Sequence, residues 1–385
     1  MNILGYVRPD GSVGFRNYVL VLPTCVCSSH AAKVIGRERP DVVAVVHQHG
    51  CAQVGTDVDQ TARTLIGLGA NPNVAAALVT GLGCETINAK RITAGIAATG
   101  KAVEAVVIQD AGGTRKAIEL GLPLVDRLRD YAGKQKRERV GPDALVLALE
   151  CGGSDACSGI TANPSAGTTS DFLVEAGGTV ILSETTEFIG AEHLLRARCV
   201  NDATGDRLVE IVKRVEDRAH RIGVDIRGAN PAPGNLVGGI TTIEEKALGC
   251  TYKAGTAPIQ EVLEYGVKPT RKGLVVMDTP GQDVESVIGM VAGGAQVVVF
   301  TTGRGSPTGC PIAPVIKVAS NSRMYARMEE NMDINAGTIV EGTETVAQVG
   351  RRIFEKVLAT ASGERTKAEL LGHDEFGLYR IAPTF

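Results

Sequence analysis

Short apolar runs alternate along the chain with longer stretches of mixed polarity. Runs of about six residues that are apolar throughout are typical of strands that a parallel sheet buries on both faces. The stretches between them, such as 57–68 and 86–98, are long enough for the helices that connect parallel strands. In the first part of the chain the apolar runs are 18–23, 42–46, 75–80 and 103–108.

The same alternation starts again after a charged stretch at 134–139, which Gly141 and Pro142 follow in the manner of a surface linker. We therefore predict an α/β fold with two parallel-sheet units, an N-terminal domain of residues 1–138 and a C-terminal domain of residues 139–385. A chain of 385 residues is long enough for two or three domains. The apolar runs of the second part are 144–149, 179–182, 273–277 and 295–300.

Charge and composition exclude several classes of protein. Lys and Arg number 40 against 43 Asp and Glu, without a basic stripe, so we expect no nucleic-acid partner. The first residues carry charges and turn formers where a signal peptide has an apolar core, and no run reaches the ~18 apolar residues of a membrane span. We therefore expect a cytoplasmic protein. Nine cysteines without an export signal indicate reduced thiols, either in the core or as nucleophiles or metal ligands.

Many residues with reactive side chains directly follow the predicted strands. Open α/β sheets bind their ligands beyond the carboxyl ends of the strands. We therefore predict that the functional site lies at these ends. Six of the nine cysteines lie there, namely Cys25, Cys27, Cys51, Cys84, Cys151 and Cys310.

The loop after the second run contains His47, His49 and Cys51 within five residues. Two imidazoles and a thiol at this spacing suit iron or zinc. The alternative is a turn in which one histidine caps backbone groups and the cysteine belongs to the core. Cys84 and Glu85 form a second such turn, with the same alternative of a buried thiol that acts as a small hydrophobe.

A sharper motif follows the first run of the second domain. Gly152 and Gly153 let the backbone approach an anion, while the thiol of Cys151 lies beside it. Ser154 and Asp155 add polar groups for a substrate. The alternative is a glycine turn in which one of these two residues caps the next helix, and both interpretations are compatible.

Two further motifs carry groups for recognition or proton transfer. Arg304, in the glycine-rich loop 303–310, is a candidate clamp for a substrate carboxylate, or an exposed arginine of an ordinary loop. Glu184 and His193 offer metal ligation or proton transfer, or mark a solvated helix start. We assign no chemistry to Cys199, Cys250, His220 and His373.

The chain lacks the phosphate-binding, dinucleotide-binding, zinc-ribbon and nucleophile-elbow motifs, so nucleotide cofactors are disfavoured. Soft and hard ligands at the strand ends, together with an arginine loop, indicate a metal-assisted reaction on a small acid. At these loops the chain resembles the altronate/galactarate dehydratase family, which includes the large subunit of sulfolactate sulfo-lyase. The resemblance rests on residues 5–11, 14–18, 47–51, 81–85, 150–155, 158–164, 190–193, 278–281, 301–306 and 333–335.

The resemblance implies a hydro-lyase that removes water from a sugar acid of the altronate or galactarate type to give a 2-keto-3-deoxy acid, with Fe²⁺ or Mn²⁺ as the metal. It implies metal ligands among His47, His49, Cys51, Cys84, Cys151 and Cys310. The implied proton-transfer residues are His49, Glu85, Glu184 and His193, and the implied substrate-binding residues are Gly152, Gly153, Ser154, Asp155 and Arg304. The alternative to a single metal ion is an iron–sulfur cluster on Cys51, Cys84, Cys151 and Cys310.

Full-length dehydratases of the family begin with a small β-rich domain of the antifreeze-like type, whereas this chain opens almost directly at Gly5 and Tyr6. We therefore expect a separate small subunit that supplies this domain, and a homo-oligomer. Two alternative functions remain open. One is a sulfolactate sulfo-lyase large subunit that releases sulfite, and the other is a non-catalytic subunit that binds a small acid.

Overall fold

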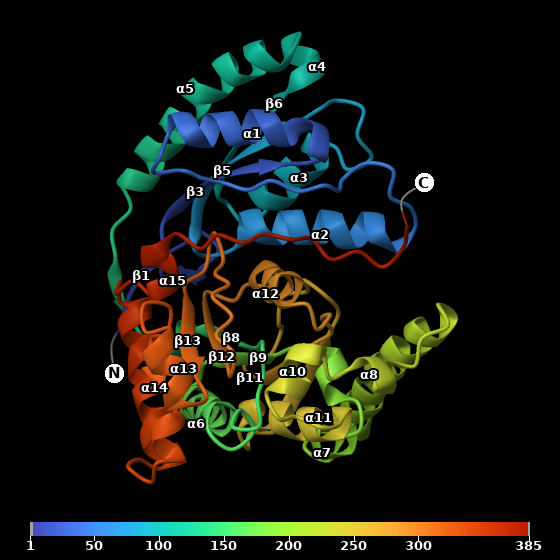
Figure 1. Cartoon of the computed structure of the whole chain (residues 1–385). Coiled ribbons are helices and arrows are strands. Elements are labelled where there is room, and N and C mark those ends of the chain that lie inside the picture. The colour runs from blue at the N-terminus through green and yellow to red at the C-terminus, as the bar shows by residue number, and fades with distance from the viewer. Residues whose placement is uncertain (1–2, 384–385) are drawn as a thin grey trace.

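Two parallel β-sheets, one in each half of the chain, organise the fold (Figure 1). The computed structural model describes residues 3–383. The first sheet has the strand order β4-β3-β5-β6, and its strands pair in parallel. The α/β class with two parallel sheets is confirmed. The strands of the first sheet are β3 (Tyr18–Pro23), β4 (Val43–Ala44), β5 (Val74–Gly81) and β6 (Ala102–Val107).

Helices cover both faces of the first sheet. α1 (Val26–Glu38) and α5 (Thr114–Gly133) pack on one face, and α2 (Thr56–Ala70) and α3 (Ala89–Ala97) pack on the other. Every residue of β5 is buried, because this strand lies in the interior of the sheet between β3 and β6. The short helix α4 (Ile108–Ala111) precedes α5.

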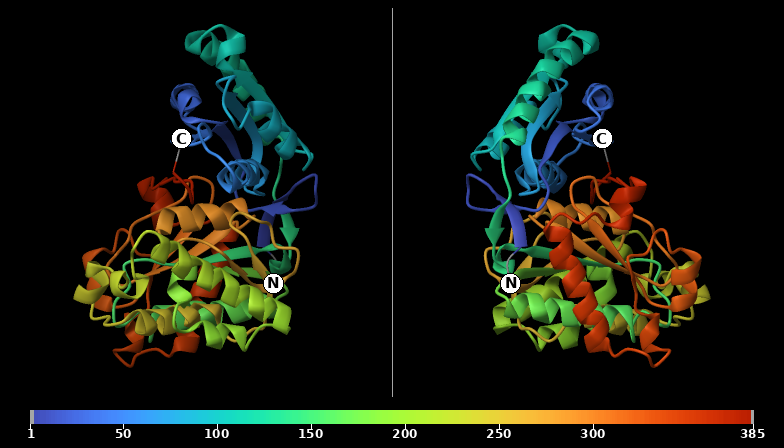
Figure 2. Two further views of the ribbon diagram at one scale, coloured as in Figure 1. Left: turned by 90° about the vertical axis from the view of Figure 1, so that its right-hand side faces the viewer. Right: turned by 90° about the vertical axis from the view of Figure 1, so that its left-hand side faces the viewer.

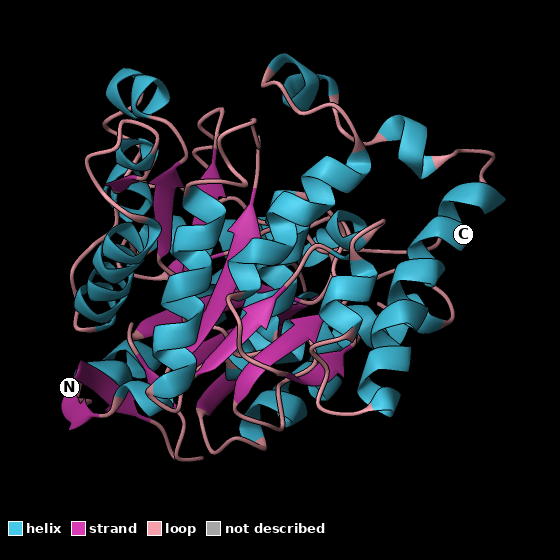
Figure 3. Ribbon diagram, turned by 90° about the horizontal axis from the view of Figure 1, so that it is seen from below, coloured by secondary structure: helices cyan, strands magenta, loops and turns pink. Residues whose placement is uncertain are grey.

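The second sheet has seven parallel strands in the order β10-β11-β9-β8-β12-β13-β14. α6 (Ala162–Glu175) and α14 (Val346–Ala361) pack on one face, and α12 (Asp283–Ala292) packs on the other. Seen from below, helices lie in front of the strands of this sheet (Figure 3). The strands are β8 (Val146–Cys151), β9 (Thr179–Leu182), β10 (Ile259–Leu263), β11 (Gly273–Met277), β12 (Val297–Thr302), β13 (Val315–Ala319) and β14 (Ile334–Asn335).

The chain between β9 and β10 forms a helical insertion beside the second sheet. Its last helix, α11 (Ile243–Thr251), packs against the turn that follows β9. The insertion therefore brings residues distant in sequence to the carboxyl ends of β8 and β9. Its other helices are α7 (Glu192–Arg196), α8 (Asp202–Arg221), α9 (Ile226–Ala229) and α10 (Pro233–Val237).

A small antiparallel sheet forms beside the junction of the two halves. It contains β1 (Ile3–Val7), β2 (Val13–Gly14) and β7 (Glu138–Val140). The expected domain boundary after residue 138 falls inside β7. The charged sequence of β7 predicts a linker, and the strand forms because its backbone pairs with β1.

The two halves meet where α2 packs against α12, with the narrower first half above the broader second half (Figure 2). After α13 (Ser322–Arg327) and α15 (Lys367–Leu371), the C-terminal segment runs along α2 (Figure 1). The Asp57 carboxylate accepts the backbone N–H groups of Ile381 and Ala382, both at 2.8 Å. Within residues 3–383, no helix has the length and apolar composition needed to cross a membrane.

Candidate active site

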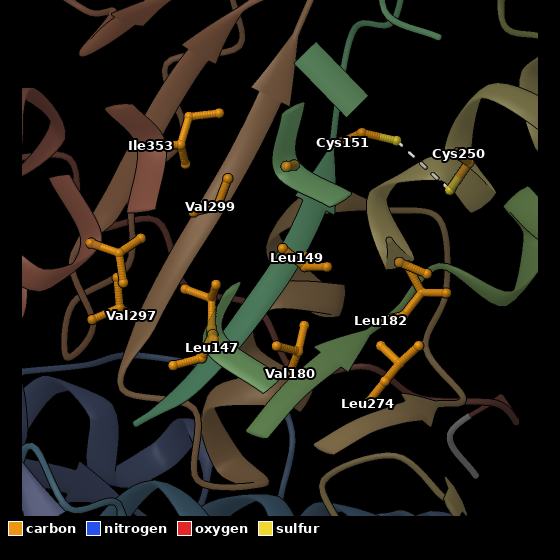
Figure 4. Close-up of a cluster of buried hydrophobic side chains, with 14 of the residues drawn as sticks. Leu147, Leu149, Cys151, Val180, Leu182, Cys250, Leu274, Val297, Val299 and Ile353 are labelled. Atoms are coloured by element: carbon orange, nitrogen blue, oxygen red, sulfur yellow. Dashed lines mark hydrogen bonds between the residues drawn. The ribbon is translucent and has the colours of Figure 1, made fainter. Parts of the chain in front are cut away.

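A compact group of potential metal ligands lies at the carboxyl end of β8. In the described part of the chain, Cys151, Glu184 and Cys250 are the group of three whose ligand atoms all lie within 4.8 Å of one another. The Sγ atom of Cys151 is 3.6 Å from Oε1 of Glu184 and 4.0 Å from Sγ of Cys250. Figure 4 shows the Cys151 side chain pointing toward Cys250.

Sheet topology explains how two of these residues meet. β8 and β9 are parallel neighbours, so Cys151 at the end of one and Glu184 just beyond the other lie at the same edge. Glu184 has a φ of 67°, a left-handed conformation that costs a non-glycine residue on the order of 1–3 kcal/mol. Thr279 holds this conformation, since its Oγ1 accepts the Glu184 N–H at 2.7 Å. The carboxylate then accepts the Cys151 N–H at 2.9 Å.

Two lysines, the buried Lys253 and the partly buried Lys246, neutralise the carboxylates around this group. The ammonium group of Lys253 donates to Oε2 of Glu184, and Nζ of Lys246 lies 2.7 Å from Oε1 of Glu187. Burial alone would lower the pKa of Lys253, but the neighbouring thiols and carboxylates outweigh it and raise that pKa well above its usual value. Lys253 therefore stays charged.

The donor set can hold a divalent metal ion. Two sulfur ligands and one carboxylate combine the soft and hard donors that borderline cations accept. Donors bound to one small cation lie roughly 3.3–3.8 Å apart, a range that contains the 3.6 Å between Cys151 and Glu184, whereas the two thiols are 4.0 Å apart. The hydrogen bond to Cys250 and burial raise the pKa of the Cys151 thiol well above its usual range, so ionising it requires the positive charge that a bound metal supplies.

On the opposite face of the sheet, a row of three side chains lies beneath this group. Glu150, Phe300 and Lys317 are neighbours across β8, β12 and β13. Nζ of Lys317 lies 3.3 Å from the centre of the Phe300 ring and has no hydrogen-bond partner among the described residues. Burial lowers the pKa of Lys317 to about 7. One oxygen of Glu150 accepts the hydroxyls of Ser183 and Ser286 at 3.1 Å and 2.6 Å.

His47 and Glu85, in the first half of the chain, form hydrogen bonds with residues of the loops around them. The Nε2 atom of His47 lies 2.7 Å from the carbonyl oxygen of Pro23, and its Nδ1 atom accepts the backbone N–H of His49 at 3.2 Å. Burial lowers the pKa of His47 to about 4. Glu85 accepts the hydroxyl of Thr24 at 2.8 Å. This geometry favours the capping interpretation of His47 over metal ligation.

The other predicted ligands of the first half do not form a group of three among residues 3–383. Cys51 and Cys84 are exposed, and His49 is partly buried. Cys310 lies in the apolar core, where burial raises its pKa to about 11. The structure therefore brings Cys151 close to Cys250 but to none of the other thiols expected for a cluster. The ligand roles of His49, Cys51 and Cys84 stay predictions.

The predicted substrate loop, residues 152–155, is hydrogen-bonded to the arginine loop, residues 303–310. The carbonyl oxygen of Gly153 accepts the backbone N–H groups of Gly303 and Arg304 at 3.2 Å and 2.8 Å. Gly153 has a φ of 58°, which its missing side chain permits. Asp155 accepts the N–H of Ser158 at 2.9 Å, so it caps the following turn, as the alternative interpretation states.

A cavity of about 260 Å³ lies between the substrate loop and α11. Ser154 and Asp155 line one side, and Lys246 and Gly249 line the other. Cys151, Glu184 and Cys250 do not line this cavity, but its Lys246 and Gly249 lie on the same helix as Cys250. Gly152 does not line this cavity and packs against the Asp283 carboxylate. His193 is exposed on α7 and does not join the group.

Sequence reasoning missed three residues of this site. Lys246, Cys250 and Lys253 follow one another at spacings of four and three residues, which place side chains on the same face of a helix. This face carries the partners of Glu187, Cys151 and Glu184. The spacing of Lys246, Cys250 and Lys253 could have indicated this face from the sequence, although Cys250 alone in a helical context indicates no chemistry.

Two family models match nearly the whole chain. The model described as D-galactarate dehydratase/Altronate hydrolase, second domain, matches residues 5–133, and the model described as D-galactarate/Altronate dehydratase, C-terminal, matches residues 143–384.

Curated relatives match over similar lengths of this chain. The subunit beta of (2R)-sulfolactate sulfo-lyase from Chromohalobacter salexigens is 38% identical, over 98% of this chain and 97% of its own. Galactarate dehydratase (L-threo-forming) from Escherichia coli is 38% identical, over 98% of this chain and 76% of its own. Altronate dehydratase from Bacillus subtilis is 34% identical, over 99% of this chain and 78% of its own. Together with the family models, these matches show that the chain belongs to the D-galactarate/altronate dehydratase family.

Proposed function

We propose that this chain is the catalytic subunit of a metal-dependent hydro-lyase that removes water from a sugar acid and yields a 2-keto-3-deoxy acid. One observation carries the proposal: the Cys151, Glu184 and Cys250 donors lie together at the carboxyl ends of β8 and β9. Lys246, on the same helix as Cys250, lines a nearby cavity. Relatives that are galactarate and altronate dehydratases support this reaction type.

Cys151, Glu184 and Cys250 would hold the metal, for which we propose Fe²⁺. When bound, a divalent cation polarises the carboxylate and the 2-hydroxyl of the acid and makes the proton on C2 more acidic. Lys253 fixes Glu184 for this role, since its ammonium group holds Oε2 while Oε1 faces the Cys151 thiol.

Loss of the 3-hydroxyl needs a proton donor, and Lys246 is suited to that task. Its Nζ atom contacts Oε1 of Glu187 at 2.7 Å and donates to Oδ1 of Asn230 at 3.0 Å. An ammonium group has three donors, so one N–H remains for a substrate in the cavity that Lys246 lines. Burial would lower the pKa of Lys246, but Glu187 outweighs it and keeps that pKa above its usual value. His49, Glu85, Glu184 and His193 remain the predicted proton-transfer residues, and the sequence does not assign the base that removes the C2 proton.

A second function has a specific observation in its favour. The sulfo-lyase subunit beta aligns with this chain over 97% of its own length, whereas the dehydratases align over 76–78% of theirs. In this alternative the same elimination expels sulfite instead of water. Either version includes a separate small subunit with the antifreeze-like domain, which we propose as the partner of this chain.

The test is an assay of the chain assembled with its small subunit under anaerobic conditions with added Fe²⁺. Galactarate, altronate and sulfolactate are offered separately, and keto acid and sulfite are measured. Keto acid from a sugar acid without sulfite supports the hydro-lyase. Sulfite from sulfolactate, with no product from either sugar acid, supports the alternative. Absence of product from all three acids contradicts both.

A matched pair of variants connects the activity to the site. Cys151→Ala removes a proposed ligand, and Cys199→Ala removes a partly buried thiol between α7 and α8 that is not part of the group. Turnover that Cys151→Ala abolishes and Cys199→Ala retains supports the proposed site. Full turnover in Cys151→Ala contradicts it.

A further inference from the structure

A second cavity, of about 640 Å³, lies on the other side of the substrate loop. Three arginines line it: Arg304 after β12, and Arg323 and Arg327 on α13. Residues four apart on a helix share a face, so Arg323 and Arg327 line the same wall. Within residues 3–383, none of the three guanidinium groups has a hydrogen bond or an ion pair.

The one carboxylate in the lining does not neutralise these arginines. Oδ1 of Asp155 accepts the hydroxyls of Ser158 and Ser320 at 2.8 Å and 2.7 Å. Oδ2 accepts the amide of Asn321 at 2.9 Å. The Asp155 carboxylate is therefore committed to its own loop and to the end of β13, and the cavity keeps an excess of positive charge.

Unpaired guanidinium groups that face one space favour an anion there. A guanidinium group offers a planar pair of donors that matches the oxygens of a carboxylate or a sulfonate. Asp155 lines both this cavity and the smaller cavity beside α11. Arg304 in the larger cavity donates its backbone N–H to Gly153, which lies two residues beyond Cys151. Gly238 in the wall of the larger cavity accepts the N–H of Ala156 from the loop that lines the smaller cavity.

We propose that this cavity binds a second anionic group of the substrate, so that the enzyme prefers acids with two anionic groups. Galactarate, with two carboxylates, and sulfolactate, with a carboxylate and a sulfonate, belong to this class. Altronate, with one carboxylate, does not. This inference rests on the proposed function and narrows its substrate class.

The test compares two substrates in the assembled enzyme. The double variant Arg323→Gln/Arg327→Gln should lower the ratio of kcat/KM for galactarate to kcat/KM for altronate by about 10-fold or more, mainly through KM for galactarate, because each lost charge-assisted bond is costly. Arg115→Gln, an exposed and unpaired arginine on α5, is the matched control and should leave this ratio unchanged. An unchanged ratio in the double variant overturns the proposal.

A binding measurement separates this inference from the elimination chemistry. Adipate has two carboxylates and no hydroxyl group, so it cannot be dehydrated, and hexanoate is the matched monocarboxylate. Calorimetry on the assembled enzyme should show adipate binding more tightly than hexanoate, and the double variant should lose this difference. Equal affinities in the unmodified enzyme overturn the inference, whatever the turnover assay shows. Adipate preference without turnover of any acid supports the anion site while contradicting the proposed function.

Discussion

Arg16 and Glu369, which are 353 residues apart, form a two-armed ion pair. Nε of Arg16 lies 2.7 Å from Oε1 of Glu369, and Nη2 lies 2.8 Å from Oε2. Arg16 also donates to the carbonyl oxygen of Thr360 at 2.9 Å. The pair thus joins the segment before β3 to the C-terminal end of α14 and to α15, and it connects the two halves of the molecule.

Removing one partner of this pair should destabilise the protein. Arg16→Met leaves the largely buried Glu369 carboxylate without its countercharge. Breaking a buried pair in this way costs about 3–5 kcal/mol. Denaturant unfolding should show this loss in the free energy of unfolding, while Arg115→Gln should stay within about 0.5 kcal/mol of the unmodified protein. A loss below about 1 kcal/mol for Arg16→Met would contradict a stabilising role of the Arg16–Glu369 pair.

The same pair predicts a response to acid. Burial would raise the pKa of Glu369, but the hydrogen bonds and charge of Arg16 outweigh it and hold that pKa below its ordinary value of 4.5. The unfolded chain then binds the proton before the folded protein does, so this contribution is present above pH 4.5 and is lost as the pH falls through the lowered pKa. Between pH 3 and pH 7, the free energy of unfolding should decrease less steeply with falling pH in Glu369→Gln than in the unmodified protein.

The amount of bound iron should distinguish thiols that bind the metal from thiols that belong to the core. Cys250→Ala should lower the iron bound after anaerobic loading to well below one ion per chain, because it removes one of three clustered donors. Cys310→Ala should retain its iron, since that thiol lies in the apolar core. Iron, acid-labile sulfide and the visible spectrum are measured together on each variant. Iron lost from Cys310→Ala and kept by Cys250→Ala would place the site elsewhere, and sulfide equal to iron would indicate a cluster.

Lys253 and Glu184 should be strongly coupled in stability. Lys253→Met leaves a fully buried carboxylate without its ammonium partner, which costs about 3–5 kcal/mol, and Glu184→Gln leaves the amine unpaired in the same way. The double variant should be more stable than the sum of the two losses predicts, by at least about 1 kcal/mol. Additive losses in metal-free protein would show that the two groups do not interact.

Lys317 should destabilise the fold at neutral and lower pH. Burial lowers its pKa to about 7, while the unfolded chain keeps the usual 10.5, so the unfolded chain binds the proton more tightly. The free energy of unfolding therefore rises with pH between these two values. Lys317→Met should raise stability by about 1–4 kcal/mol at pH 6 and by less at pH 10. A variant less stable than the unmodified protein at pH 6 would indicate that the Phe300 contact dominates.

Much of the two sheets could be predicted from apolar runs, because interior strands such as β5 are buried along their whole length. β13 was missed since Lys317 interrupts its apolar run, although the sheet buries that lysine completely. β7 has no apolar run of its own and depends on β1. Pairing partners of this kind are set by tertiary structure and leave no periodicity in the local sequence.

The site was predictable where it depends on strand ends. Cys151 and Glu184 follow strands that are neighbours in the sheet, and the rule for strand carboxyl ends finds both. Cys250 reaches them through the insertion between β9 and β10, whose docking no local pattern specifies. At His47 both ring nitrogens contact backbone groups, and its role as a metal ligand stays a prediction.

The Asp57 carboxylate, at the start of α2, binds backbone groups of Ile381 and Ala382. A ribosome makes α2 early and these two residues only after every strand of both sheets. During synthesis, the first unit therefore carries an Asp57 carboxylate without these partners, and the arrival of the C-terminal segment satisfies it. These contacts of α2 therefore form only after the C-terminal segment has been made.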